Sequence, residues 1–254
     1  MTDTAGNPSG SNVTVNIALN KGLSLAVDPL FNGGYLNAAG STVDQILSGT
    51  AQNAGLGAKV KLTINGVELT ADVGANGKWS LTLPTAQLSQ LADGPLSLAL
   101  TIVDANNNVV QVNPAPVLNV LTHNLPTFGL LDPLFGADGI LNAVEATTAQ
   151  TLSGVINNVA VGTTVTVTIG TQILTTQVQA GGVWHVDLLP SLLGGLQDGS
   201  LQVNISVKDV AGNIVNTQVG ATVLIHNLPQ VSLNPIFGDG ILNAADLLLN
   251  QTIS

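Results

Sequence analysis

The chain has 254 residues, of which 45% are hydrophobic, only 8% are charged and 3% are aromatic. Five Lys, no Arg and fifteen Asp or Glu give a net charge of −10, which argues against nucleic acid as a partner because its recognition needs a basic surface. The absence of Cys excludes disulfides and thiol chemistry, and no uninterrupted apolar run is long enough to predict a membrane span.

The sequence repeats itself at a spacing of about 105 residues, which is typical of a tandem array of similar domains. The recurring motifs are Leu47-Ser48-Gly49 with Leu152-Ser153-Gly154, Trp79 with Trp184, Asp93-Gly94 with Asp198-Gly199, and Asp104 with Asp209. His123-Asn124-Leu125-Pro126 returns at a slightly shorter step as His226-Asn227-Leu228-Pro229. We therefore predict four parts of a longer array: the tail of a preceding repeat or a linker (1–20), repeat 1 (21–124), repeat 2 (125–227) and the start of a third repeat (228–254).

In repeat 1, strands are predicted at 59–64 and 67–73, because Asn65-Gly66 between them is a strong two-residue hairpin signal. In repeat 2, residues 163–169 alternate Thr with β-branched apolar side chains, which is the period-two pattern of a half-buried strand. The other elements predicted in repeat 2 are strands at 127–131, 150–156, 172–179, 183–187, 200–207 and 214–225, a loop at 132–146, a helical turn within 190–197 and a turn at 209–213.

Seven short strands per repeat, with turns every 8–12 residues or so, predict an immunoglobulin-like β-sandwich. The fold class is therefore all-β, with tandem seven-stranded sandwiches joined end to end in an elongated array. Trp79 and Trp184 fall at matching strand positions, and we expect both side chains in the cores of their sandwiches.

Acidic and amide side chains lie close together in the loop after the first strand of repeat 2, and the same pattern recurs at the start of the third repeat. The two sets share one spacing, Asp138, Asn142 and Glu145 in repeat 2 and Asp239, Asn243 and Asp246 in the third start. Oxygen ligands on a loop that contains Gly suit Ca²⁺, which takes roughly six to eight of them. Counting strands places Asp198 at the same end of the repeat, and the turn of the following repeat would add the equivalent of Asp209.

Electrostatics favours a bound cation at such a junction. Two like charges about 4 Å apart repel by about 4 kcal/mol at an effective dielectric constant near 20. We therefore predict a structural Ca²⁺ site at domain junctions, with ligands drawn from these eight side chains. Repeat 1 has Gly33 and Gly40 where repeat 2 has acids and keeps only Asn37, so its loop is expected to bind metal weakly or not at all.

Plainer interpretations of the same residues stay open. Asp followed by Gly is common in turns, and an Asn or Asp followed three residues later by an acid often caps a helical turn. Asp104 and Asp209 are equally consistent with closing a turn. His123 and His226 occupy matching linker positions, and we expect local hydrogen bonds there, not metal ligation.

The order of these motifs is distinctive. It runs from Asp132-Pro133-Leu134-Phe135-Gly136 through 139–145, Leu152-Ser153-Gly154 and Val183-Trp184 to Asp198-Gly199 and 209–213. This order resembles the tandem immunoglobulin-like repeats of very large bacterial surface adhesins, the biofilm-associated (Bap/BapA-like) proteins. The resemblance covers nearly the whole chain. It implies a secreted protein at the bacterial cell surface, export by type I secretion, and Ca²⁺ at domain junctions that stiffens the stalk.

The leading hypothesis is a structural spacer in the stalk of an adhesin that takes part in biofilm formation and cell adhesion. No catalytic constellation or phosphate-binding loop is present in the sequence, so enzymatic activity is not expected. The expected partners are neighbouring repeats of the same chain, and like adhesins on other cells or abiotic surfaces. Two alternatives are a module that binds a glycan or a surface, and association of identical chains through Thr- and Val-rich edge strands without charged residues.

Overall fold

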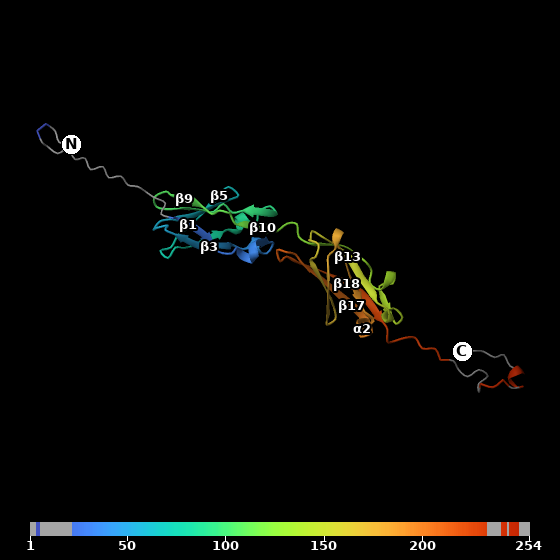
Figure 1. The fold of residues 1–254 in the computed structure, drawn as a ribbon. Coiled ribbons are helices and arrows are strands. Elements are labelled where there is room, and N and C mark those ends of the chain that lie inside the picture. The colour runs from blue at the N-terminus through green and yellow to red at the C-terminus, as the bar shows by residue number, and fades with distance from the viewer. Residues whose placement is uncertain (1–3, 6–21, 233–239, 243, 249–254) are drawn as a thin grey trace. The chain divides into compact units, whose positions relative to one another are not determined.

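The computed structural model describes residues 4–5, 22–232, 240–242 and 244–248, and within them the regular structure is mainly β-strands, with a few short helical segments (Figure 1). It divides into two compact units. The first consists of the chain up to residue 127 together with 157–163 and 207–215, and the second consists of the remainder. Among the described helices, none has the length and apolar character needed to cross a membrane.

Repeat 1 is a sandwich of two layers. One layer is the sheet β1-β3-β6, formed by Ser24–Val27, Gln45–Gln52 and Lys78–Leu83. The other layer has two parts: β5-β4-β8-β9 (Val67–Asp72, Lys59–Ile64, Thr101–Val103, Val109–Gln111) and β2-β10-β7 (Tyr35–Asn37, Val117–Leu121, Gly94–Ser97). A short helix, α1 (Thr85–Leu88), follows β6.

Repeat 2 has the same strand order with a continuous second layer. Its smaller sheet is β11-β13-β16, formed by Thr127–Leu131, Gln150–Asn157 and Val183–Leu188. Its larger sheet is β12-β18-β17-β14-β15, formed by Ile140–Asn142, Ile214–Leu224, Gly199–Lys208, Thr164–Ile169 and Gln172–Gln177. The helix α2 (Pro190–Leu193) follows β16. The all-β, immunoglobulin-like class predicted from the sequence is thus confirmed.

A local insertion explains why the second layer is broken in repeat 1 and continuous in repeat 2. His123 follows Asp104 by nineteen residues, whereas His226 follows Asp209 by seventeen. The longer segment contains Pro114 and Pro116, which have no backbone N–H to donate to a neighbouring strand. The last strand of repeat 1 is therefore interrupted between β9 and β10.

Each repeat contains one strand that we did not predict from the sequence. The predicted loop at 132–146 contains β12, which pairs in parallel with β18, and β2 pairs with β10 in the same way in repeat 1. Each of these strands has only three residues. Three residues are too few to show the alternation of apolar and polar side chains that identifies a strand, so both segments were predicted as loop. Repeat 2 accordingly has eight strands, not seven.

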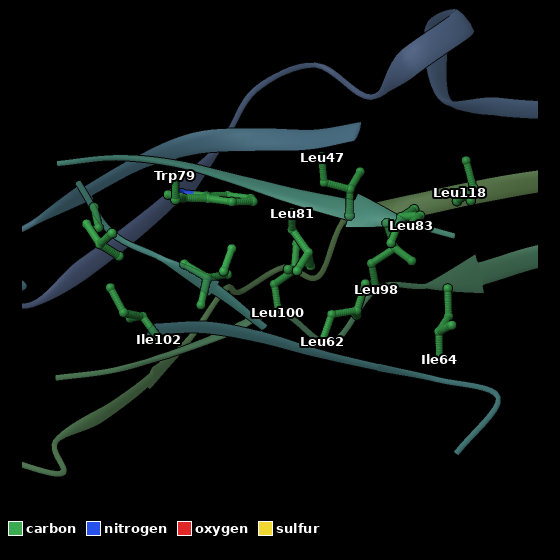
Figure 2. Close-up of a cluster of buried hydrophobic side chains, with 14 of the residues drawn as sticks. Leu47, Leu62, Ile64, Trp79, Leu81, Leu83, Leu98, Leu100, Ile102 and Leu118 are labelled. Atoms are coloured by element: carbon green, nitrogen blue, oxygen red, sulfur yellow. The ribbon is translucent and has the colours of Figure 1, made fainter. Parts of the chain in front are cut away.

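Buried side chains from both layers form the core of repeat 1. Leu81 and Leu83 of β6 face Leu62 of β4 and Ile102 of β8, and all four are at most 2% exposed (Figure 2). Trp79 is 3% exposed, and its counterpart Trp184 in repeat 2 is fully buried. The prediction that both Trp side chains are core residues is confirmed.

Each Trp packs against a Gly that has no room for a side chain. Gly49 lies directly opposite Trp79 in the pairing of β3 with β6, and Gly154 lies opposite Trp184 in β13 and β16. A Cβ added to Gly49 would lie 2.7 Å from Trp79 Cζ2 and still nearer to the carbonyl oxygen of Ala26. This close approach explains why Leu-Ser-Gly and Trp recur together in the sequence.

Candidate metal-binding loops

The predicted calcium loop of repeat 2 connects β11 to β13 and is held by residues in the left-handed backbone region. Phe135 has φ = 54° although it is not Gly, and Gly136 and Gly139 have φ values of 76° and 68°. Phe135 is 2% exposed, so packing of its ring offsets the cost of this conformation, which is about 1–2 kcal/mol for a residue with a side chain. The tight path leads from the single turn η3 (Gly136–Asp138) directly into β12.

Asn142 and Glu145 bind each other's backbone at the next turn, η4 (Glu145–Thr147). Asn142 Oδ1 accepts hydrogen bonds from the N–H groups of Val144 and Glu145, both at 3.0 Å. Glu145 Oε2 accepts one from the Asn142 N–H at 3.1 Å. This reciprocal arrangement is a capping box, so the capping interpretation holds for these two residues. Capping uses only one oxygen of the Glu145 carboxylate.

Asp138 lies in the same loop and is exposed to solvent. Its Oδ1 accepts a hydrogen bond from the Ile140 N–H at 3.0 Å, which closes a turn around Gly139. Its Oδ2 and the Oε1 of Glu145 take no part in these hydrogen bonds, and Glu145 Oε1 lies beside Gly136, 3.8 Å from where a Cβ would be. The loop therefore offers two carboxylate oxygens, fewer than a Ca²⁺ ion requires.

The carboxylate of Asp198 holds the start of the linker that leaves repeat 2, and we call this contact a latch. Its carboxylate accepts hydrogen bonds from the N–H groups of Ile225 (2.8 Å), His226 (3.1 Å) and Asn227 (2.8 Å). These hydrogen bonds lower the pKa of Asp198 to about 2. The N–H groups of Ile225 and Asn227 have the largest effects, and the N–H group and ring of His226 have smaller ones. The oxygens of Asp198 are thus directed at the protein's own backbone, a role that the sequence did not predict.

Asp93 makes the same latch in repeat 1. Its carboxylate accepts hydrogen bonds from the N–H groups of Thr122 (2.8 Å), His123 (3.1 Å) and Asn124 (2.7 Å). Burial disfavours the charged form of Asp93, but these hydrogen bonds outweigh it and hold the pKa well below its usual value. His123 Nδ1 and His226 Nδ1 each lie 3.3 Å from the Oδ1 of the latch Asp in their own repeat. The expected local hydrogen bonds of both His residues are confirmed.

Asp209 closes a turn. It is 7% exposed, and its carboxylate accepts hydrogen bonds from the backbone N–H of Asn213 at 2.8 Å and from the Asn213 side chain at 2.7 Å. Asp104 does the same in repeat 1 with the backbone and side chain of Asn108, both at 2.8 Å. The side chain and backbone of Asn108, with the N–H of Asn106, lower the pKa of Asp104.

In the corresponding loop of repeat 1, which lacks the acids, amide side chains form the hydrogen bonds. Asn37 Oδ1 accepts a hydrogen bond from the Gly40 N–H at 2.7 Å, which is the counterpart of the Asn142 cap. Within the first compact unit, Asn32 Nδ2 and Asn37 Nδ2 donate to the carbonyl oxygen of Ala211 at 2.7 and 3.1 Å. Asn213 Oδ1 accepts from the Ala38 N–H at 2.9 Å.

The predicted ligands are therefore only partly brought together. Asp138, Asn142 and Glu145 share one loop, whereas Asp198 and Asp209 are each engaged in a separate local structure. Asp239 and Asn243 lie outside the described residues, as does the side chain of Asp246, whose backbone begins η6 (Asp246–Leu248). Among the described residues, no group of three Asp, Glu or His side chains is close enough to hold a metal ion.

A further recurring contact escaped the sequence interpretation. Ser48 Oγ donates a hydrogen bond to Asp28 Oδ2 at 2.7 Å, and Ser153 Oγ donates to Asp132 Oδ2 in repeat 2. The signal was visible in the sequence, because an Asp before Pro and the Ser of Leu-Ser-Gly both recur in each repeat. These bonds fix the start of the loop that follows the first strand of each repeat, and in repeat 2 this loop contains Asp138 and Glu145.

No protein-family model matches the sequence, and no curated protein matches it significantly. Among solved structures, a Ca²⁺-stabilized adhesin that helps an Antarctic bacterium bind ice is 30% identical, with a TM-score of 0.47. That similarity covers 88% of this chain, which spans only 54% of the other. A 1.5-MDa bacterial ice-binding adhesin is 27% identical over 88% of this chain and 72% of the other, with a TM-score of 0.46. A bacterial immunoglobulin-like domain from the M. primoryensis ice-binding adhesin is 33% identical over 37% of this chain and 92% of the other, with a TM-score of 0.29.

Proposed function

The chain belongs to the bacterial immunoglobulin-like repeats of large surface adhesins, and we propose that it is a stiff spacer in the stalk of such an adhesin. The observation that carries this proposal is the repeated latch. In each repeat an Asp accepts hydrogen bonds from three consecutive backbone N–H groups at the start of the linker. The latch fixes the direction in which the chain leaves the sandwich, which is what a spacer requires.

The linker after the latch restricts the chain further. Leu125 and Leu228 donate their N–H groups to the carbonyl oxygens of His123 and His226, at 2.9 and 3.0 Å. A Pro follows each Leu, which fixes one backbone angle and disfavours helical backbone at the Leu. A linker with these constraints in both copies favours a defined direction over free bending.

We expect a single narrow distance distribution between labels on the two repeats. The chain has no Cys, so Leu56→Cys in the first compact unit and Leu189→Cys in the second, at positions that are 81% and 57% exposed, would carry spin labels at known places. Pulsed electron paramagnetic resonance would measure the distribution with and without chelator. Chelator should not broaden the distance distribution, because the loop of repeat 1 that contacts the turn at 209–213 lacks the acids that would bind calcium. A broad distance distribution in the labelled chain without chelator would refute the proposal of a stiff spacer.

We further propose that Ca²⁺ binds the acidic loop of repeat 2 and is completed by oxygens of the following repeat. Asp138 and Glu145 each have one carboxylate oxygen outside the hydrogen bonds that shape the loop. Two oxygens leave most of a calcium shell unfilled, so further ligands are required, and the turn of the following repeat that corresponds to the turn of Asp209 would supply them. The same role is proposed for Asp239, Asn243 and Asp246. The printed description of one relative as Ca²⁺-stabilized supports this proposal.

Calcium should raise the melting temperature of repeat 2, and the double substitution Asp138→Asn with Glu145→Gln should remove that increase. The substitutions keep size and much of the hydrogen bonding but take away two charges that favour a divalent cation. Melting followed by Trp184 fluorescence in a Trp79→Phe background, with calcium or with chelator, measures the effect. The matched control is Asp44→Asn with Asp187→Asn, which removes two acids elsewhere. In a chain that includes the following repeat, equal calcium responses in both variants, or none in the parent chain, would exclude this site.

The cellular role follows from the same proposal. We propose that the adhesin is secreted to the bacterial cell surface by type I secretion, that its stalk contributes to biofilm formation and cell adhesion, and that its repeats meet like adhesins on other cells or abiotic surfaces. We propose no catalytic role for these repeats. Both Trp side chains are buried, so neither supports the alternative of a glycan-stacking surface.

A further inference from the structure

The larger sheet of repeat 2 ends in a strand whose outer edge is unpaired. β15 is the last strand of β12-β18-β17-β14-β15, and in the described part of the chain it pairs with β14 alone. Its six residues extend over about 20 Å. Natural proteins usually protect such an edge with charged residues, Pro or a bulge, because it is a template for another strand. β15 contains none of the charged residues or Pro.

Repeat 1 shows what protection looks like at the same place. Its edge strand β5 and the neighbouring β4 carry two ion pairs, Lys59 with Asp72 and Lys61 with Glu68. The positions 105 residues later hold the uncharged Thr164, Thr166, Ile173 and Gln177. All four charges are thus absent from one edge and present at the other. Ile173 is 67% exposed in the place of Glu68.

We propose that β15 (Gln172–Gln177) pairs edge to edge with the β15 of a second copy of this chain. The antiparallel pairing joins the larger sheets of the two copies into one continuous sheet. It goes beyond the spacer role, because it makes repeat 2 a lateral contact between neighbouring stalks. Repeat 1, with its charged edge, stays a spacer only.

The strand is compatible with itself. An antiparallel pair of identical strands is related by a two-fold axis perpendicular to the sheet, which keeps the outer faces of both copies on the same side. The outer face of β15 carries Ile173, Thr175 and Gln177, opposite Thr168, Thr166 and Thr164 of β14. Whichever register the two copies adopt, uncharged side chains face one another. Ile173 then packs against Thr175 or Gln177 of the other copy.

A single pair of edges this short is expected to bind weakly. The net charge of −10 on each chain also opposes association at long range, and salt screens that repulsion. Dimerisation should therefore strengthen as the salt concentration rises. In a tandem array many weak contacts act together, so side-by-side stalks gain avidity without any further kind of contact.

Sedimentation of the full chain at rising protein concentration tests the proposal. We expect a monomer–dimer equilibrium, weakened on the order of tenfold by Thr175→Lys, which places like charges near the two-fold axis. The matched control is Thr70→Lys, the same change 105 positions earlier on the protected edge, and it should leave dimerisation unchanged. Thr70 and Thr175 are both exposed, so neither substitution disturbs a core.

A gain-of-edge variant makes the test independent of any loss of folding. Lys59→Thr, Lys61→Thr, Glu68→Ile and Asp72→Gln together give repeat 1 the side chains of repeat 2. Each copy would then have two open edges, and species larger than dimers should form. A strict monomer at every concentration overturns the proposal, as does a dimer that Thr175→Lys leaves intact. Neither outcome affects the spacer role, which depends on the latches.

Discussion

Replacing Gly49 with Ala should unfold repeat 1 at temperatures at which repeat 2 remains folded. The new Cβ would lie 2.7 Å from Trp79 Cζ2 and nearer still to the carbonyl oxygen of Ala26. That oxygen belongs to β1, which pairs with β3 at this point, so it cannot move without opening the sheet. Overpacking usually costs about 1–3 kcal/mol, and a clash with backbone places this case at about 3 kcal/mol or more. The melting temperature of repeat 1 should fall by roughly 10–20 °C.

The two Trp residues make the measurement possible, because each repeat contains one. In a Trp184→Phe background, fluorescence reports repeat 1 alone. Gly154→Ala should cost less than Gly49→Ala, because its tightest contact, at 2.6 Å, is with the flexible end of Leu131 and the Leu130 oxygen is 3.0 Å away. Thr50→Ala is the control, since Thr50 is the exposed neighbour of Gly49 in β3. Gly154→Ala is followed in a Trp79→Phe background, which reports repeat 2. If Gly49→Ala melts like the control, the clash is not what selects Gly.

Much of the fold was predictable because its strands have strong local signals. The Thr and Val alternation at 163–169 became β14, and the Asn65-Gly66 hairpin became the connection of β4 to β5. The reason for Gly49 was not predictable, because it depends on a carbonyl oxygen of β1 some twenty residues away in the sequence. Recurrence marked the residue as important, but only the structure shows that the missing side chain makes room for two strands and a ring.

The candidate site was less predictable, because one spacing serves two chemistries. An Asn followed three residues later by Glu suits both a calcium loop and a capping box, and the structure shows the capping box. The hydrogen bonds determine which carboxylate oxygens remain available, and the sequence does not show them. Asp198 was predicted as a metal ligand, yet its oxygens face N–H groups 27–29 residues further along the chain. That contact forms only when the last strand of the repeat returns to the same end.

Acid should release the latch of repeat 2. In the folded repeat the N–H groups of Ile225 and Asn227, with His226, hold the pKa of Asp198 at about 2, below its ordinary value of 3.8. A carboxyl group whose pKa is lowered by folding stabilises the fold above its unfolded pKa and loses that effect as pH falls through its folded pKa. The contribution of Asp198 is therefore complete above about pH 4 and disappears between about pH 4 and pH 2.

Asp198→Asn should lower the melting temperature of repeat 2 by several degrees at neutral pH, because the amide keeps only one acceptor oxygen and no charge for three N–H donors. Between pH 4 and pH 2 the difference from the parent chain should shrink, since the parent then loses the same charge. Trp184 fluorescence in a Trp79→Phe background would follow repeat 2 across this range. Asp93→Asn is the matched control, and it should shift repeat 1 while leaving the melting of repeat 2 unchanged. A constant difference down to pH 2 would mean that ionised Asp198 is not what holds the linker.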